Sequence, residues 1–225
     1  MDIIESVQSV LSPPHKAGYP FILGGIAAAL LGLLFWHPLA WAGVLFALFC
    51  LYFFRDPERV LPPRANVFVA QADGRVVSIE EAVPPAELGL GDAKLMRVAT
   101  FLSVLDVHVN RSPISATVEK IAYHPGLFVN AAADKASDDN ERNSLLLRLT
   151  NGQQAVVVQI AGLIARRILC EVHEGQSLTA GQRFGIIRFG SRTDLYLPEG
   201  CKVLVSVGQR MIGGETVIAE LPAAP

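Results

Sequence analysis

The sequence predicts a mainly β fold (β-rich α+β), in which a closed or sandwiched β domain follows a hydrophobic helical membrane hairpin. Three observations carry this prediction. Residues 17–54 contain no Asp, Glu, Lys or Arg. After them, apolar and polar residues alternate with a period of two, which is the pattern of half-buried strands. Glycines separate the short apolar runs, and short strands with glycine turns are typical of sandwiches and barrels.

The uncharged run at residues 21–54 is too long for a signal peptide, and Asp2 and Glu5 precede it instead of a basic cluster. About 20 apolar residues cross a bilayer core, so the run is longer than one span and slightly short for two. Trp36 and His37 suit a membrane interface, and Pro38 breaks a helix. We therefore expect two short helices in a hairpin. One long tilted helix, or a buried hairpin in a soluble protein, is the alternative.

Basic residues flank this run, with Lys16 before it and Arg55, Arg59 and Arg64 after it. The positive-inside rule then places both ends of the hairpin, and the domain that follows, on the cytoplasmic side of the cell (inner) membrane. The formal net charge of −2 gives no basic balance. A nucleic-acid partner is therefore not expected.

The proline-rich residues 55–66 predict a linker between the hydrophobic helices at 1–54 and a β-rich domain at 67–225. A short helix is expected at residues 131–135. The alternation predicts strands at residues 67–71, 75–79, 94–101, 115–123, 144–149, 155–160, 167–172, 183–189, 193–197, 202–207 and 216–221.

One pattern occurs twice in this domain, at residues 173–187 and 206–221. Each copy has Gly-Gln, a few residues, another Gly and then an apolar strand. The pattern resembles the half-repeat of lipoyl- or biotinyl-type barrel-sandwich domains, so we expect a barrel-sandwich-like architecture. No lysine lies at a hairpin tip between the two copies, so a carrier role is not expected.

Common cofactor and metal motifs do not occur in the sequence. The five histidines are scattered, and there is no His-x-x-His, no Cys-x-x-Cys, no Gly-rich phosphate loop and no Gly-x-Ser-x-Gly. The three cysteines, Cys50, Cys170 and Cys201, match no zinc or redox spacing. We therefore expect no metal site.

Several polar segments have ordinary explanations when each is taken alone. Asp73-Gly74 is typical of a turn, and the polar stretch at 134–149 is typical of a solvated loop. Gly190-Ser191, between two apolar runs, is typical of a β-bulge or a tight corner. His108 alternates with two valines, so we expect it to face outward or into a cleft.

Together, these segments have the order of motifs in the phosphatidylserine decarboxylase family. AQADGRV, FLSVLDVHVNRSP, YHPGLFVNA with DKASDDNERN, QIAGLIARRI and RFGSRTDLYLP follow one another from about residue 55 to the C-terminus. The chain resembles the short bacterial form of the family. Five ordered motifs are far more specific than any one of them.

The resemblance implies a lyase made as a self-cleaving zymogen. The cut falls between Gly190 and Ser191 and gives a β chain (1–190) and an α chain (191–225). Ser191 becomes a covalent pyruvoyl cofactor, which forms a Schiff base with phosphatidylserine and yields phosphatidylethanolamine and carbon dioxide. Asp73 matches the aspartate used in self-cleavage, and His108 matches the histidine of the decarboxylation site.

The chain departs from the family pattern at two places. Arg111 stands where familiar members have a second histidine, so the base for self-cleavage is either His108 together with Asp73 or another group such as His124. At the cleavage site, Phe189 and Arg192 flank Gly190-Ser191 where familiar members often have Leu and Thr. Arg111 is also a candidate for binding the substrate, as is Arg142.

The expected partners are phosphatidylserine in the membrane and the two chains produced by cleavage; whether the protein is also a homo-oligomer stays open. The alternative function is a non-enzymatic, membrane-anchored barrel-sandwich adaptor. An adaptor explains the hairpin and the strand pattern, but it gives no reason for Gly190-Ser191 between two strands.

Overall fold

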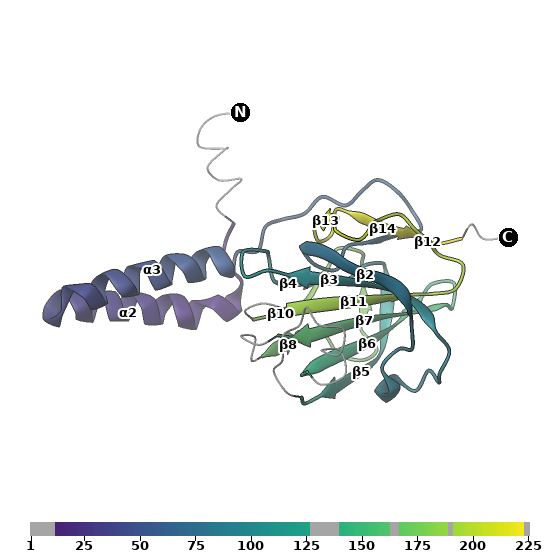
Figure 1. Cartoon of the computed structure of the whole chain (residues 1–225), viewed down its shortest axis with the longest axis horizontal. Helices are drawn as coiled ribbons and strands as arrows, with labels where there is room; N and C mark the ends of the chain where they lie inside the picture. Colours follow the sequence, from purple (N-terminus) through teal and green to yellow (C-terminus); the bar gives the residue numbers. More distant parts are fainter. Residues whose placement is uncertain (1–11, 127–139, 163–166, 189–190, 223–225) are drawn as a thin grey trace. The chain divides into compact units, whose positions relative to one another are not determined.

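The computed structural model describes residues 12–126, 140–162, 167–188 and 191–222. The chain divides into two compact units, Met1–Glu58 and Arg59–Pro225, and the division falls within residues 55–66. The first unit contains the 3-10 helix η1 (Lys16–Gly18) and the helices α2 (Tyr19–Phe35) and α3 (His37–Phe53). The named strands all belong to the second unit (Figure 1).

The two helices of the first unit form a hairpin because the chain is extended at Trp36, with φ −164° and ψ 103°. Pro38 lies in the first turn of α3, where its missing N–H costs no helical hydrogen bond. Small residues let the helices approach closely, since a Cβ on Gly25 would lie 2.9 Å from the backbone nitrogen of Ala47. The predicted pair of helices is confirmed, and the alternative of one long helix is wrong.

The surface of the hairpin is strongly apolar. Leu34, Phe35 and Trp41 are 76%, 81% and 70% exposed. Residues Lys16–Phe35 are long and apolar enough to cross a membrane, whereas α3 is a shorter apolar helix. These features are consistent with association of the hairpin with a membrane.

The second unit contains one large sheet and two small ones. The large sheet has the strand order β13-β2-β3-β11-β7-β6-β5-β9 and is curled (Figure 1). Its strands are β2 (Gly74–Ala82), β3 (Leu95–Leu102), β5 (Ala116–His124), β6 (Arg142–Leu149), β7 (Gln154–Ala161), β9 (Ser177–Leu178), β11 (Ser191–Leu197) and β13 (Arg210–Met211). The 3-10 helix η2 (Ala86–Leu88) follows β2.

Each small sheet has three strands. One has the order β1-β14-β12, formed by β1 (Val67–Val69), β14 (Val217–Glu220) and β12 (Lys202–Val203). The other has the order β4-β10-β8, formed by β4 (Val109–Arg111), β10 (Arg183–Ile187) and β8 (Ile168–Cys170). Neighbouring strands pair antiparallel in all three sheets. The second unit therefore consists mainly of β-strands, which confirms the mainly β fold class.

The large sheet separates two apolar clusters. Its inner face packs against the small sheets through the main core, which includes Phe68, Val98, Leu195 and Ile218. Its outer face carries a smaller cluster around Tyr196. Because side chains alternate along a strand, neighbouring residues of β11 lie in two different environments.

Every predicted strand overlaps an observed one. The prediction missed β4, β9 and β13, which have only two or three residues and are too short to show alternation. The expected helix at 131–135 lies outside the described residues. The repeated pattern has a structural counterpart, since each copy contains a two-residue strand, β9 or β13, followed by a longer one, β10 or β14.

Candidate active site

Ser191 is the first residue of β11, a central strand of the large sheet. It pairs with Leu102 on β3 and with Ala161 on β7, so both neighbouring strands hold its backbone. Its side chain is fully buried, and its Oγ has no hydrogen-bond partner within the described part of the chain. The expected cleavage partner, Gly190, lies outside the described residues. The structure therefore places a buried hydroxyl, without a partner among the described residues, at a position held by two neighbouring strands.

The inner face of the large sheet is polar next to Ser191 and apolar beyond it. One register row crosses four strands with only polar side chains: Thr100, Thr193, Gln159 and Asn143. The next row on this face is apolar: Val98, Leu195, Val157 and Leu145. Thr193 is two residues beyond Ser191, or about 7 Å along the strand. The polar row therefore lies next to the serine, on the same face of the sheet.

Hydrogen bonds connect this polar row to two more buried amides. Asn143 Nδ2 donates to Gln159 Oε1 over 2.9 Å, and Gln159 Nε2 donates to Asn110 Oδ1 over 2.7 Å. Gln71 Nε2 donates to Thr193 Oγ1 over 3.0 Å. The side chains come from distant parts of the sequence but form one buried polar cluster.

His108 lies on a segment that adjoins the serine and is fully buried, so it does not face outward. Its backbone carbonyl accepts a hydrogen bond from Ile187, and Ile187 packs against Ala161, the partner of Ser191. Its Nδ1 is 2.9 Å from the carbonyl oxygen of Asp106. A carbonyl only accepts hydrogen bonds, so Nδ1 carries the hydrogen and Nε2 is the basic nitrogen of the neutral ring.

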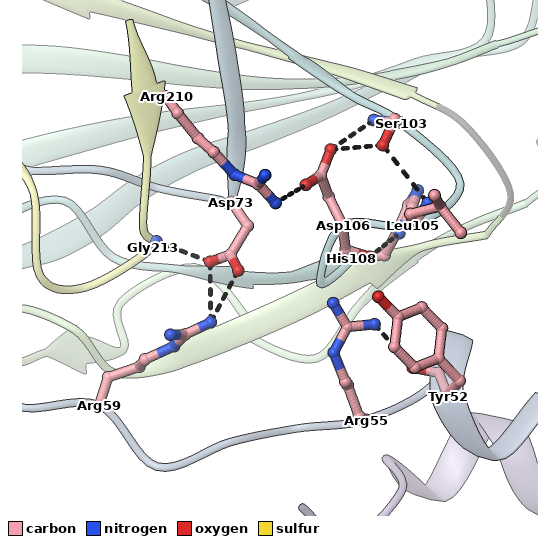
Figure 2. Close-up of polar contacts among 10 residues, drawn as sticks. All are labelled: Tyr52, Arg55, Arg59, Asp73, Ser103, Leu105, Asp106, His108, Arg210 and Gly213. Atoms are coloured by element: carbon pink, nitrogen blue, oxygen red, sulfur yellow. Dashed lines mark hydrogen bonds and ion pairs between the residues drawn. The ribbon is translucent and has the colours of Figure 1, made fainter. Parts of the chain in front are cut away.

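The carboxylate of Asp106 fixes the loop that presents this carbonyl (Figure 2). Its Oδ2 accepts hydrogen bonds from the backbone nitrogen and the hydroxyl of Ser103, over 2.9 Å and 2.7 Å. Its Oδ1 is 3.1 Å from Arg210. Asp106 therefore acts on His108 through the backbone. The sequence pattern predicted no role for Asp106, although FLSVLDVHV contains the Asp-x-His spacing that places it beside His108.

Asp73 is held by other groups (Figure 2). Both of its oxygens accept from Arg59 Nη2, over 2.9 Å and 2.8 Å, and Oδ1 also accepts from the Gly213 amide over 2.8 Å. Burial raises the pKa of the Asp73 carboxyl above its ordinary value, and Arg59 and Gly213 offset only part of the rise. Among the described residues no hydrogen bond joins Asp73 to His108, so the predicted pair of these two is not formed directly.

Comparison with known proteins decides the family. The profile of the phosphatidylserine decarboxylase family matches residues 46–219. The chain belongs to the phosphatidylserine decarboxylase family. A protein from Granulibacter bethesdensis named phosphatidylserine decarboxylase proenzyme is 65% identical over 221 residues, 98% of this chain and 91% of the relative. Proteins of the same name from Gluconacetobacter diazotrophicus and Cereibacter sphaeroides are 60% and 56% identical; the matches cover 98% and 97% of this chain and 100% and 94% of those proteins.

Arg111 is one of the positions at which this chain departs from the family pattern, and the structure shows its surroundings. Arg111, in place of the second histidine, donates to the carbonyl of Gly181 over 2.9 Å. A Cβ on Gly214 would lie 3.2 Å from Arg111 and 3.3 Å from Arg59, so the two arginines flank one glycine beside Asp73. Arg111 is therefore part of the Asp73 region in this member of the family.

Arg142 lies on the other face of the large sheet. Its Nε donates to Glu87 over 2.7 Å, and its register partner on β7 is Ile160, a member of the outer apolar cluster. Ser191 faces the inner side. The structure therefore does not bring Arg142 and Ser191 together.

His124 lies on β5, which is separated from the serine strand β11 by two other strands of the large sheet. It pairs with Arg142 on β5 and β6, while Arg142 pairs with Ile160 on β7. Ile160 in turn pairs with Arg192 on β11. Three strand spacings are about 14 Å, which is too far for direct proton transfer.

Arg192 is fully buried on the outer face and is matched by an acidic partner. Its Nε and Nη2 donate to the two oxygens of Asp194 over 2.7 Å and 3.0 Å, and Arg97 lies 3.7 Å from the same carboxylate. Burial raises the pKa of Asp194, against the effect of both arginines. This pairing anchors the residue that follows Ser191. Among the described residues, no group of three or more His, Cys, Asp or Glu side chains is arranged to hold a metal ion.

Proposed function

We propose that the chain is a pyruvoyl-dependent phosphatidylserine decarboxylase, made as a zymogen that cuts itself between Gly190 and Ser191. The observation that carries the proposal is the buried Ser191 hydroxyl, without a partner in the described ranges, at the start of a central strand. Membership of the family supports the same reaction, because the compared relatives are named decarboxylase proenzymes. The non-enzymatic adaptor is not favoured, since it leaves this serine without a role.

In self-cleavage, the Ser191 hydroxyl attacks the carbonyl carbon of residue 190. The new C–O bond replaces the C–N bond, and the freed nitrogen takes up a proton. Loss of the Ser191 α-proton then expels the acyl group as a carboxylate, and hydrolysis of the remaining enamine releases ammonia and leaves a ketone. We assign the proton transfers to His108 Nε2, because Nδ1 donates to Asp106 and because His124 lies too far away.

The surroundings of residue 191 fit a pyruvoyl group. The group has the same three carbons as serine: its ketone oxygen would replace the amino nitrogen on the α-carbon, and the hydroxyl that would be lost has no partner among the described residues. The group supplies a sink for the electron pair released when carbon dioxide leaves. His108 then holds a proton at Nε2 and returns it to the α-carbon of the lipid.

Two acidic residues have positioning roles in this proposal. Asp106 sets the tautomer and direction of His108 through its carbonyl, while Ser103 and Arg210 hold its carboxylate. Asp73, fixed by Arg59, supplies negative charge near Arg111. We keep Arg111 as a proposed substrate-binding side chain. The pairing of Arg142 with Glu87 on the outer face argues against direct contact of Arg142 with the reacting carbon.

We place the second unit on the cytoplasmic side of the inner membrane, with the hairpin in the bilayer. The exposed apolar surface of α2 and α3 and the basic residues beside the run support this location. Protease added outside sealed spheroplasts should leave residues 59–225 intact. Their degradation under those conditions would contradict the assigned side.

Turnover of the purified full-length protein tests the function. Wild-type protein in detergent micelles should release carbon dioxide from phosphatidylserine and form phosphatidylethanolamine, and Ser191→Ala should do neither. Ser144→Ala removes another buried hydroxyl, on the outer face, and should keep activity. A fully cut wild-type protein that leaves phosphatidylserine unchanged would refute the assigned substrate.

A further inference from the structure

Four buried polar atoms around Ser191 have no hydrogen-bond partner among the described residues. The atoms are Gln71 Oε1, Thr100 Oγ1, Asn110 Nδ2 and Ser191 Oγ. All four side chains have zero exposure to solvent. A buried polar atom without a partner is unfavourable, and native interiors contain few of them. Four such atoms near one another indicate a site at which another molecule binds and supplies the missing hydrogen-bond partners.

The hydrogen bonds of the polar row fix which way each amide points. Asn110 must turn its oxygen toward Gln159, because Gln159 Oε1 already accepts from Asn143 and only its nitrogen is left to donate. Asn110 therefore presents an NH₂ group to the site. Gln71 uses its nitrogen on Thr193, so it presents its oxygen. After self-cleavage has removed the Ser191 hydroxyl, the site offers one amide donor and one amide acceptor, together with the Thr100 hydroxyl.

We propose that the three of these atoms that remain after self-cleavage, on Gln71, Thr100 and Asn110, form the subsite for the amino-acid head group of the lipid, with Asn110 donating to its carboxylate and Gln71 accepting from its amine. The inference rests on the proposed function and deepens it, because it assigns the residues that select serine. Both groups lie close to the reacting position, since Gln71 bonds to Thr193 and Asn110 bonds to Gln159, its neighbour in the row.

The chemistry of this subsite suits a zwitterionic head group better than the other common ones. A phosphate offers only acceptors and would leave the Gln71 oxygen without a partner. A quaternary ammonium has no N–H to donate. The hydrogen-bonding groups of this subsite are neutral. A neutral amide such as that of Asn110 binds a carboxylate less strongly than a guanidinium would. Asn110 therefore orients the carboxylate without opposing the loss of its charge as carbon dioxide.

Trapping of lipid on the cut protein tests the assignment with a readout other than the rate of product release. Sodium cyanoborohydride reduces the bond between a lipid amine and a ketone at residue 191, and so adds the mass of the lipid, before or after loss of carbon dioxide, to the 191–225 chain. The lipid concentration for half-maximal trapping is measured in mixed micelles for phosphatidylserine and for phosphatidylethanolamine, which has the amine but no carboxylate. Asn110→Leu should raise this concentration about tenfold for phosphatidylserine and leave it unchanged for phosphatidylethanolamine.

Two further variants complete the design. Gln71→Met should weaken trapping of both lipids, because both have the amine, and Ser144→Ala, on the outer face, should weaken neither. If Asn110→Leu stays uncut, Asn110→Asp keeps the size and the oxygen that accepts from Gln159, and it should show the same loss of preference for phosphatidylserine.

An unchanged ratio between the two lipids would overturn the assignment. If neither Asn110 variant cut itself, the assignment would also be overturned, because Asn110 would then be required for self-cleavage. Wild-type protein that is cut but traps neither lipid would instead refute the proposed function.

Discussion

The two faces of β11 contrast in how they treat buried polar groups. On the outer face, Arg192 and Asp194 bond to each other through two short hydrogen bonds, and Arg97 adds a third charge. On the inner face, Ser191 has no partner in the described part of the chain, and neighbouring Gln71 and Thr100 each keep one unpartnered atom. The seven-residue strand β11 thus carries a hydrogen-bonded ion pair, Arg192 and Asp194, and a neutral hydroxyl, Ser191, that has no partner among the described residues.

The contrast separates stability from function. A buried charge must be matched, because an unmatched one would cost several kcal/mol. A neutral polar atom costs less when it is left alone, so a protein can keep such atoms ready for a substrate. We therefore expect changes on the outer face to lower the free energy of unfolding, and changes on the inner face to lower the rate.

Substitution of His108 should have the largest effect on the rate. His108→Gln keeps much of the size and polarity of the side chain but cannot take up a proton near neutral pH. The kcat for decarboxylation should fall by about 10²–10⁴, which is the usual contribution of a general acid or base. The value is measured per cut chain, because self-cleavage also depends on His108 in this account and should slow as well, whereas thermal unfolding should change little. Normal turnover by this variant would remove His108 from the site.

Loss of Arg192 should have the largest effect on stability. Arg192→Met leaves the Asp194 carboxylate buried with only Arg97 nearby, so the free energy of unfolding should fall by about 3–5 kcal/mol. Denaturant unfolding in a Ser191→Ala background avoids interference from cleavage. The double variant Arg192→Met with Asp194→Leu should recover most of the loss. If the single variant proved as stable as its parent, the pair would not anchor β11.

Much of the fold was readable from local patterns, and much of the site was not. The alternation of residues placed the longer strands, and Pro38 marked the break in the hairpin. The row formed by Gln159 and Asn143 depends on strand register, which no local pattern specifies. Arg59 meets Asp73 only through the tertiary fold, so its role was also missed. A local signal did exist for Gln159, a lone polar residue in the apolar run AVVVQIA.

The pH dependence of stability sharpens the comparison at Asp73. Burial raises its folded-state pKa above 3.8, so the folded protein binds this proton more tightly than the unfolded chain does. Wild-type stability should therefore fall, relative to Asp73→Asn, as the pH rises from below 3.8 through the raised pKa. Denaturant unfolding at a series of pH values measures the difference. A difference that grows in favour of the wild type over this range would show that the Arg59 ion pair outweighs burial.

The smallest effect is expected when single hydroxyls on the two faces are compared. Thr100→Val removes a hydroxyl that has no partner among the described residues, so the free energy of unfolding should stay the same or rise by up to about 1 kcal/mol. Ser144→Ala removes a hydroxyl that bonds to Glu87 and should lower it by about 1 kcal/mol. Equal losses for both variants would contradict the distinction between the faces.

The intact mass of the purified protein under denaturing conditions tests the central claim most directly. Wild-type protein should give two chains, residues 1–190 and 191–225, and the smaller should begin with a ketone and lack a free amino group. Ser191→Ala should give one chain of 225 residues. A single uncut chain from active wild-type protein, or a cut Ser191→Ala chain, would contradict the account.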